Sequence, residues 1–381
     1  GGNLGNLQAP PMIQTNKTNN MSKLEELYNQ WLSIQPLKTE DRARLDQKFS
    51  LEFNYNSNHI EGNTLTYGQT EMLLLFGKVI DEANMKDLEE MKAHNVGLKM
   101  MQTEAATKKP LTGTFIRQLH QTILREDYTV YRQLPDGNTT SYMIHAGQYK
   151  TRPNSVITVT GERFEYASPE ETQALMADLI QWYNEEEKKG ELSPAELAAI
   201  FHYRYIRIHP FEDGNGRIAR LLVNFILLRH NYPMIIVRSK FKEVYLSALN
   251  KCDSIVGSIP SDGAHATLSQ LKPFVEYIES ILVDEMTNDI KFINEKAVNI
   301  WWYNGEFITF RNDNTVKILQ LMTSNPDITI RELADKLKIN KSAIQKQIKN
   351  LREKEYISRV GEKKGHWHVA IVCTTQKGGT K

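Results

Sequence analysis

One stretch of twelve residues, His209–Arg220, constrains the fold and the chemistry of this chain more than any other, and its sequence is HPFEDGNGRIAR. Gly214 and Gly216 can adopt positive φ angles, which lets neighbouring backbone N–H groups converge on an anion. The apolar run 221–228 follows directly. It predicts a helix whose N-terminus, with its free N–H groups and favourable dipole, begins at these glycines. The stretch therefore predicts a phosphate site at a junction between a loop and a helix.

Four side chains of this stretch supply chemistry for such a site. Arg217 and Arg220 are one helical turn apart, so both guanidiniums can point at one polyphosphate. Asp213 is a hard oxygen ligand of the kind that suits Mg²⁺. His209 is the one group of the stretch that can take a proton near neutral pH. A helix start with a glycine turn and surface arginines would explain any three of these residues, but not all of them in register.

The stretch resembles the signature of the Fic family, His-x-Phe-x-(Asp/Glu)-Gly-Asn-Gly-Arg-x-x-Arg, at every defined position. The resemblance implies transfer of AMP from ATP to a protein hydroxyl, with His209 as the base and Mg²⁺ on Asp213. Arg220 would hold the γ-phosphate. The ATP-phosphate site as a whole would comprise Gly214, Asn215, Gly216, Arg217 and Arg220.

The glycine at position 216 bears on which group is transferred. A close relative of the family with lysine at this position phosphorylates its target, whereas Gly216 keeps the pattern of the AMP-transferring members. Some members transfer phosphocholine or UMP instead, and the signature alone leaves these open.

A second pattern lies upstream, at Ser57-Asn58-His59-Ile60-Glu61-Gly62. It matches the inhibitory pattern of the Fic family, (Ser/Thr)-x-x-x-Glu-(Gly/Asn). Ser57 and Glu61 are four residues apart and would share one face of a helix. The resemblance places that face over the phosphate site, with Glu61 paired to Arg220 and the resting enzyme nearly silent. Taken alone, the pattern is common and favours a surface glutamate before a glycine stop; its position N-terminal to a Fic core favours the inhibitory interpretation.

Two further segments take roles from the resemblance. Residues 149–164 predict a hairpin with a turn at Gly161-Glu162, and this hairpin resembles the Fic flap. The flap registers the backbone of a target protein beside the site by strand addition; an ordinary surface hairpin is the alternative. Residues 245–253 resemble the segment that lines the adenine pocket, so Tyr245 and Asp253 are candidate adenine contacts.

Hydrophobic periodicity predicts a mainly α fold with one small β-hairpin, which matches the Fic helical core that the resemblance implies. Capping boxes begin at Ser168, Ser193 and Thr329, and Thr39 is expected to cap a helix that ends near His59. Further helices are expected at 23–34, 66–77, 84–105, from 112, 241–252 and 271–284.

The C-terminal part of the chain resembles a winged helix-turn-helix domain. The resemblance rests on three predicted helices at 316–323, 332–337 and 342–354, followed by strands at 356–360 and 367–371. DNA or a protein could bind at 341–369, where Lys341, Lys346, Lys349 and Arg352 line part of the expected recognition helix.

Six segments are expected along the chain. They are a disordered tail (1–20), an N-terminal helical region with the inhibitory helix (21–110), the Fic catalytic core (111–285), a linker (286–312), a winged helix-turn-helix domain (313–372) and a polar tail (373–381).

Composition narrows the class of protein. The chain has 47 basic and 46 acidic residues, which argues against a globally basic nucleic-acid coat. Cys252 and Cys373 fit no metal spacing and indicate ordinary thiols in a reducing cytosol. No apolar run approaches the roughly 18 residues that span a membrane, and the first residues lack the apolar segment of a signal peptide. We therefore expect a cytoplasmic protein that does not span a membrane; a homo-oligomer is compatible with the sequence.

The main interpretation is a protein adenylyltransferase that moves AMP from ATP to a Ser, Thr or Tyr hydroxyl of a target protein or of itself. Two alternatives remain open at this point. In one, the Fic body only senses nucleotide and the chain is a DNA-binding regulator. In the other, Glu61 positions a water that removes AMP from a modified protein.

Overall fold

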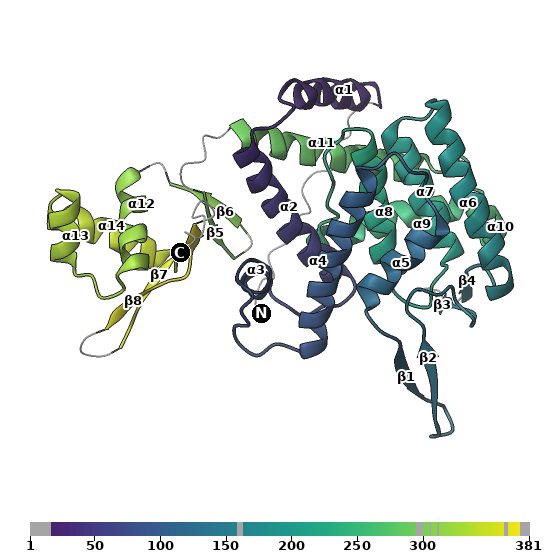
Figure 1. Cartoon of the computed structure of the whole chain (residues 1–381), viewed down its shortest axis with the longest axis horizontal. Helices are drawn as coiled ribbons and strands as arrows, with labels where there is room; N and C mark the ends of the chain where they lie inside the picture. Colours follow the sequence, from purple (N-terminus) through teal and green to yellow (C-terminus); the bar gives the residue numbers. More distant parts are fainter. Residues whose placement is uncertain are drawn as a thin grey trace, which may run out of the picture. The chain divides into compact units, whose positions relative to one another are not determined.

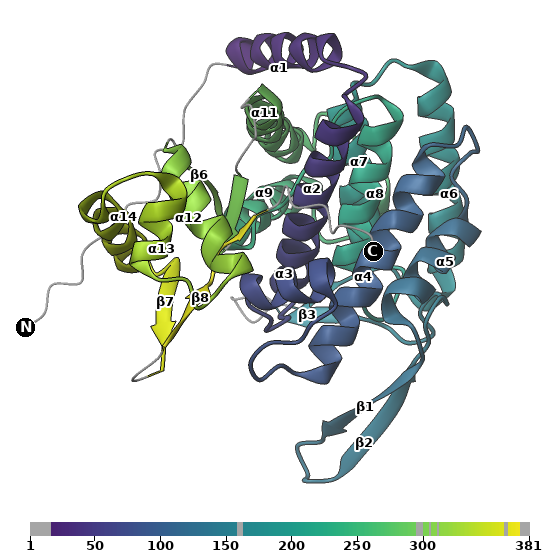
Figure 2. The same ribbon diagram turned by 60° about the vertical axis from the view of Figure 1, so that its left-hand side comes forward.

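The computed structural model describes residues 17–157, 163–294, 300–304, 306–310, 312–361 and 365–373, shown in Figures 1 and 2. They form two compact units. The described part of the first unit covers 17–38, 49–65 and most of 82–291; the second covers 39–48, 66–81 and the described residues from 292 onward. Helices dominate the element order, and the predicted mainly α fold is confirmed.

The first unit is built around α8 (Asn215–Arg229), which packs against α7 (Pro194–Ile208) and α4 (Met85–Ala105). Every α8 residue from Ile218 to Leu227 is buried, as expected for a helix surrounded by other helices. Its remaining helices are α1 (Lys17–Ser33), the second part of α2 (Thr39–Ile60), α5 (Gly113–Leu124), α6 (Pro169–Lys189), the 3₁₀ helix η1 (Ser239–Phe241), α9 (Lys242–Val256), α10 (Pro260–Ala264) and nearly all of α11 (Lys272–Asn294).

The helix starts follow local capping chemistry. The capping boxes predicted at Ser168, Ser193 and Thr329 are confirmed, each with the reciprocal pair of hydrogen bonds. The cap predicted at Thr39 is wrong, because Thr39 already lies inside α2 and Lys38 is the cap without a side-chain hydrogen bond. Glu40 and Asp41 in the first turn supply negative charge to this helix end instead.

Two antiparallel hairpins belong to the first unit. The predicted hairpin contains β3 (Ser155–Ile157) and β4 (Arg163–Glu165), while its predicted turn at 161–162 lies outside the described residues. A second hairpin, β1 (Tyr128–Gln133) and β2 (Thr139–Ile144), extends away from the helices in both views (Figures 1 and 2). The sequence did not reveal it, because most of its residues on both faces are exposed and leave no apolar alternation.

The second unit contains the winged helix-turn-helix that the sequence predicted. The helices α12 (Asp313–Ser324), α13 (Ile330–Leu337) and α14 (Lys341–Glu353) precede the β7–β8 hairpin (Ile357–Val360, His366–Val369). Leu319, Leu333 and Ile344 are fully buried and contribute to its apolar core. This unit also holds α3 (Tyr67–Phe76) and the three-stranded sheet β6-β5-β9 (Glu306–Thr309, Ile300–Tyr303, Val372–Cys373).

Two expected segments differ from the structure. The stretch 286–312, expected as a linker, holds the end of α11 and the strands β5 and β6, because buried Trp301 and Trp302 anchor an aromatic strand. Residues 17–20 of the expected tail begin α1, since no glycine or proline interrupts the chain there. The other tail residues, 1–16 and 374–381, lie outside the described residues.

None of the helices in the described ranges has the length and hydrophobicity that a membrane span requires.

Candidate active site

The loop between α7 and α8 carries the signature residues. It begins at His209, the C-cap of α7, which has a left-handed φ of 53°. It ends at Gly214, the N-cap of α8, whose φ of 82° favours glycine. The Asn215 side chain closes the loop, since its Nδ2 donates to the Phe211 carbonyl (2.6 Å) and its Oδ1 accepts from the Phe211 N–H (3.0 Å). The Asn215 amide is thus committed to the loop, which leaves its backbone N–H at the start of α8 for an anion.

His209 is held as a neutral imidazole. Its Nδ1 lies 3.2 Å from the Ile206 carbonyl; because a carbonyl only accepts, Nδ1 must donate and the Nε2 lone pair is free. The ring stacks on Tyr166 with centroids 3.9 Å apart. Burial, assisted by the positive charge of Lys150, lowers the pKa of His209 to about 4. The imidazole is therefore neutral at pH 7 and able to accept a proton.

Arg220 is clamped by the end of α2. Its Nη2 donates to Glu61 Oε1 at 2.7 Å and to the Ser57 carbonyl at 3.1 Å, and its Nε donates to Ser57 Oγ at 3.0 Å. Burial alone would raise the pKa of Glu61, but Arg220 overrides it and holds this pKa below its usual value. The structure thus brings Ser57, Glu61 and Arg220 together, as the spacing and the resemblance predicted.

Gly216 leaves the space that Glu61 occupies. A Cβ atom at position 216 would overlap Glu61 Oε1 and come within 3.0 Å of Arg220 Nη1. A side chain at this position would therefore force the Glu61 carboxylate to shift.

Arg217 is held more loosely than Arg220. Its Nη1 lies 3.5 Å from Glu90 Oε2 on α4, and its Nη2 lies 3.7 Å from Asp213 Oδ1. Its buried Nε has no hydrogen-bond partner among the described residues. An unsatisfied buried donor of this kind suits an anionic ligand, because an unpaired polar group costs free energy that a phosphate oxygen would recover.

Asp213 is the acidic group of the loop. Its Oδ1 accepts from the Gly214 N–H (2.8 Å), and its Oδ2 accepts from the hydroxyl of Tyr128 on β1. The described residues contain no cluster of three or more His, Cys, Asp or Glu side chains that could hold a metal ion. One carboxylate is nevertheless what Mg²⁺ needs when substrate phosphates and waters complete its shell. The residues therefore fit Mg²⁺ that binds together with a triphosphate.

Comparison with known proteins identifies the family. Residues 110–227 match the Fic/DOC family model, and residues 311–358 match the model of a winged helix-turn-helix DNA-binding domain. The solved structure of a Fic domain containing signaling protein from Bacteroides thetaiotaomicron is 57% identical, with a TM-score of 0.66, and the match covers 71% of this chain and 96% of that one. This chain belongs to the Fic/DOC family.

Curated Fic relatives bear the name protein adenylyltransferase fic-1. The one from Caenorhabditis briggsae is 28% identical over 268 residues, which cover 70% of this chain and 46% of that protein. The one from Caenorhabditis elegans is 30% identical over 224 residues, or 59% of this chain and 38% of that protein. The chain therefore spans less than half the length of these two relatives.

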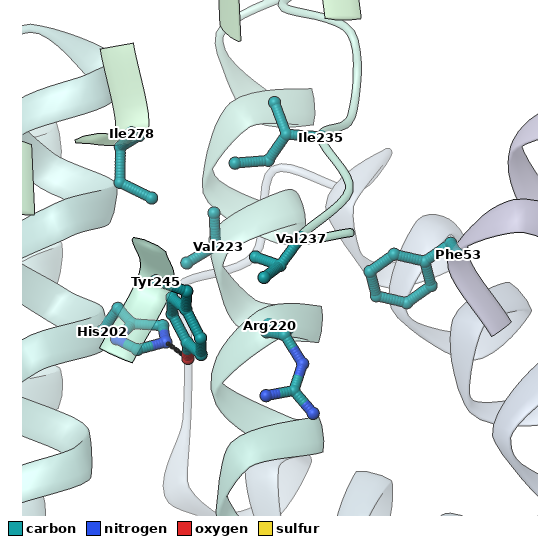
Figure 3. A pocket seen from close by; sticks show the side chains of 8 residues that line it. All are labelled: Phe53, His202, Arg220, Val223, Ile235, Val237, Tyr245 and Ile278. Atoms are coloured by element: carbon teal, nitrogen blue, oxygen red, sulfur yellow. Dashed lines mark hydrogen bonds between the residues drawn. The ribbon is translucent and has the colours of Figure 1, made fainter. Parts of the chain in front are cut away.

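The two residues expected at the adenine pocket of the Fic site lie in different surroundings. Tyr245 is buried beside Arg220, with its hydroxyl 2.6 Å from His202 Nε2 (Figure 3). Asp253 accepts from the Tyr203 hydroxyl at 2.7 Å. Adenine contacts by both residues stay predictions, and in this structure Tyr245 supports Arg220. With His202 and Arg220 it lines a small cavity whose apolar side chains are Phe53, Val223, Ile235, Val237 and Ile278.

Several residues that shape the Fic loop carried no signal in the sequence. The buried ring of His120 on α5 stacks on Phe211, and its Nδ1 accepts from the Gly147 N–H at 2.8 Å. Its Nε2 therefore carries the proton and donates to the Asp213 carbonyl at 2.8 Å. The loop region is also contacted by Tyr128 on β1, by Lys150 and Asn154 before β3, and by Tyr166 after β4.

Proposed function

We propose that this chain is a protein adenylyltransferase that moves AMP from ATP to a Ser, Thr or Tyr hydroxyl of a target protein or of itself. One observation carries the proposal: the neutral base His209 and the buried guanidiniums of Arg217 and Arg220 flank a single loop that ends at a helix N-terminus. The names of the curated relatives support it.

The residues divide the reaction between them. The pKa of an aliphatic or phenolic hydroxyl lies well above 7, so the His209 Nε2 lone pair takes its proton as the oxygen attacks the α-phosphorus. The new oxygen–phosphorus bond forms while the bond to the bridging oxygen of the β-phosphate breaks, and pyrophosphate leaves with the electron pair. Arg217, Arg220 and the first N–H groups of α8 offset the negative charge on the leaving group. Mg²⁺ bound at Asp213 would add further neutralisation.

We also propose that Glu61 inhibits this activity. The γ-phosphate needs the Arg220 guanidinium, which Glu61 already holds at 2.7 Å. The Glu61 carboxylate would repel the triphosphate as well. The ion pair therefore competes with the productive pose of ATP.

The target protein would dock on the flap. The pair β3–β4 is a two-stranded sheet, so each strand has one edge that could accept an extended segment of the target. β4 ends at Glu165, next to the Tyr166 ring that stacks on His209. A segment added at this hairpin would bring its hydroxyl near the base.

A labelled-ATP assay tests the function. The full chain, in the native and Glu61→Gly forms, is incubated in cell lysate with α-labelled or γ-labelled ATP. Transfer of the α-label alone establishes AMP transfer to protein. Transfer of the γ-label would mean phosphorylation instead, and transfer of neither label would contradict the proposal.

A second candidate function, DNA binding, belongs to the second unit. It is favoured by the family-model match of residues 311–358 and by the exposed basic residues of α14, which are Lys341, Lys346, Lys349 and Arg352. A protein partner at residues 341–369 is the alternative, because winged helices also mediate protein contacts.

A further inference from the structure

The segment that leads into the flap holds the backbone of the catalytic loop. Lys150 donates from its backbone N–H to the Pro210 carbonyl (2.8 Å) and from Nζ to the Ile208 carbonyl (3.0 Å). Asn154 Nδ2 lies within hydrogen-bonding distance of the carbonyls of His209 (3.3 Å) and Phe211 (3.1 Å). Two residues therefore contact four successive carbonyls, from 208 to 211, of which the Phe211 carbonyl also accepts from Asn215 Nδ2.

Lys150 is an unusual lysine. Its side chain is 4% exposed, and Nζ donates to two neutral oxygens, the Ile208 carbonyl and Asn154 Oδ1 (2.8 Å). Among the described residues, no carboxylate forms an ion pair with it. Burial of an ammonium group without a carboxylate is costly, and burial lowers the pKa of Lys150 to about 8. The group still carries most of its charge at pH 7, so the fold keeps a positive charge beside the loop.

The conformation of His209 requires such support. A non-glycine residue at a φ of 53° occupies a sparsely populated region that the surrounding structure must enforce. The charged groups facing His209 are Lys150, Glu61 and Asp213, and the ring of Tyr166 covers one face. The positive charge of Lys150 lowers the pKa of His209, while the two carboxylates raise it.

We propose that Lys150 and Asn154 are positioning residues for the base: they hold the His209 backbone in its left-handed conformation and join it to the start of β3. The proposal rests on the function proposed above, in which His209 is the base. Asn154 immediately precedes β3. A target that docks on the flap therefore contacts the segment that also positions His209.

Kinetics in the full chain carrying Glu61→Gly test the positioning role. Asn154→Ala should lower kcat for AMP transfer about tenfold or more, since small misplacements of reacting groups are expensive. The KM for ATP should stay within about twofold, because neither residue touches the phosphate site. Lys150→Met should behave in the same way and Lys150→Arg should recover part of the loss. Arg152→Met is the matched control, as Arg152 is exposed and lies over the Tyr142 ring.

The charge of Lys150 gives a second readout. It lowers the pKa of His209, so Lys150→Met should raise that pKa and move the acid limb of the kcat/KM profile to higher pH. Lys150→Arg and Arg152→Met should leave the limb in place. NMR of the histidine-labelled full chain measures the pKa directly, with the His209 signals identified by their loss in His209→Ala.

The NMR titration separates the two possible failures. If the Glu61→Gly parent transfers no α-label, the proposed function fails, and the titration still decides whether Lys150 acts on His209. If Lys150→Met leaves both kcat and the His209 titration at the parent values, the positioning proposal is overturned. Should Lys150→Met fail to fold, Asn154→Ala carries the test, and unchanged kcat with unshifted His209 ring signals would overturn it equally.

Discussion

The Glu61 carboxylate and the Arg220 guanidinium form the contact through which we propose that this site is controlled. Arg220 is almost fully buried, whereas the Glu61 side chain is 37% exposed. Removal of one partner from a buried pair costs about 3–5 kcal/mol, and the solvent exposure of Glu61 reduces this to roughly 2 kcal/mol. Since every 1.4 kcal/mol is about tenfold, release of Arg220 from Glu61 should be visible in activity.

We therefore expect Glu61→Gly to raise AMP transfer at least tenfold, because about 1.4 kcal/mol corresponds to a tenfold change. The increase should include transfer of AMP to the chain itself. The measurement is incorporation of α-label into the chain and into lysate proteins. Arg220→Ala added to Glu61→Gly should reverse the gain, because the γ-phosphate then lacks its guanidinium. Unchanged or lower transfer by Glu61→Gly would contradict inhibition. A decrease confined to AMP removal from a modified target would instead assign Glu61 a hydrolytic role.

His209→Ala should abolish α-label transfer in the Glu61→Gly chain while ATP still binds. Removal of a base that acts with a phosphate clamp should cost about 3–5 kcal/mol of transition-state stabilisation. Binding of ATP, measured by calorimetry, is the control, because His209 does not belong to the phosphate site. Transfer near the parental rate would show that another group takes the proton.

The candidate site residues that lie within one sequence motif could be predicted from the sequence. Those that reach the site from other parts of the chain could not. His209 and the arginines follow one another at fixed spacing, so the motif itself showed them. Lys150 and Asn154 reach the loop through hydrogen bonds to its backbone carbonyls. Such bonds require no particular residue type in the loop, so no spacing pattern marks their partners.

At the scale of elements, α14 presents a basic surface. The side chains of Ile344, Ile348 and Leu351 are buried, whereas those of Lys346 and Lys349 are exposed.

We expect the full chain to bind duplex DNA through this surface with a steep dependence on salt, because phosphate neutralisation releases counterions. Binding is measured by fluorescence anisotropy over a range of salt concentrations. Lys346→Gln with Lys349→Gln should reduce the slope of log K against log salt by roughly 0.9 for each phosphate that is no longer neutralised. Absence of DNA affinity at low salt would favour a protein partner at this surface.

Helix ends were predictable where a side chain caps its own helix, as at Ser168 and Ser193. Strands were harder, because their partners can lie far away in the chain. Strand β5 pairs with β9, which follows the whole winged helix in sequence. In the hairpin β1–β2 most side chains are exposed on both faces, so the period-2 signal of a half-buried strand is missing.

At the scale of the whole molecule, the first unit holds four neutral histidines, three of them buried and His209 half-buried. Burial lowers the pKa of His120 and of His209 to about 4, that of His202 to about 3, and that of His94 well below its usual value. In the unfolded chain these groups titrate near their ordinary pKa of about 6.5. Below that pH the unfolded state therefore binds more protons than the folded one.

Stability should accordingly be full above about pH 6.5 and should fall as the pH decreases towards about 4, by roughly 1.4 kcal/mol per pH unit for each histidine. Urea unfolding between pH 7.5 and 5 measures the slope. His202→Gln is the matched variant, because it removes one of the four histidines. It should reduce the slope of unfolding free energy against pH by roughly 1.4 kcal/mol per pH unit. A free energy of unfolding that does not change between pH 6.5 and 5 would contradict the buried neutral state.

Because residue 216 is a glycine, substitutions at this position should depend on the residue at position 61. A Cβ there would overlap the observed position of the Glu61 carboxylate, so we expect the effects of substitutions at the two positions to be coupled. Gly216→Ala should push Glu61 off Arg220 in the native chain, yet it should meet no such obstacle when Glu61→Gly is already present. A pairwise mutational scan should therefore reveal strong epistasis between two positions that are distant in the chain, and the contact between Glu61 and the start of α8 could be found from the scan alone.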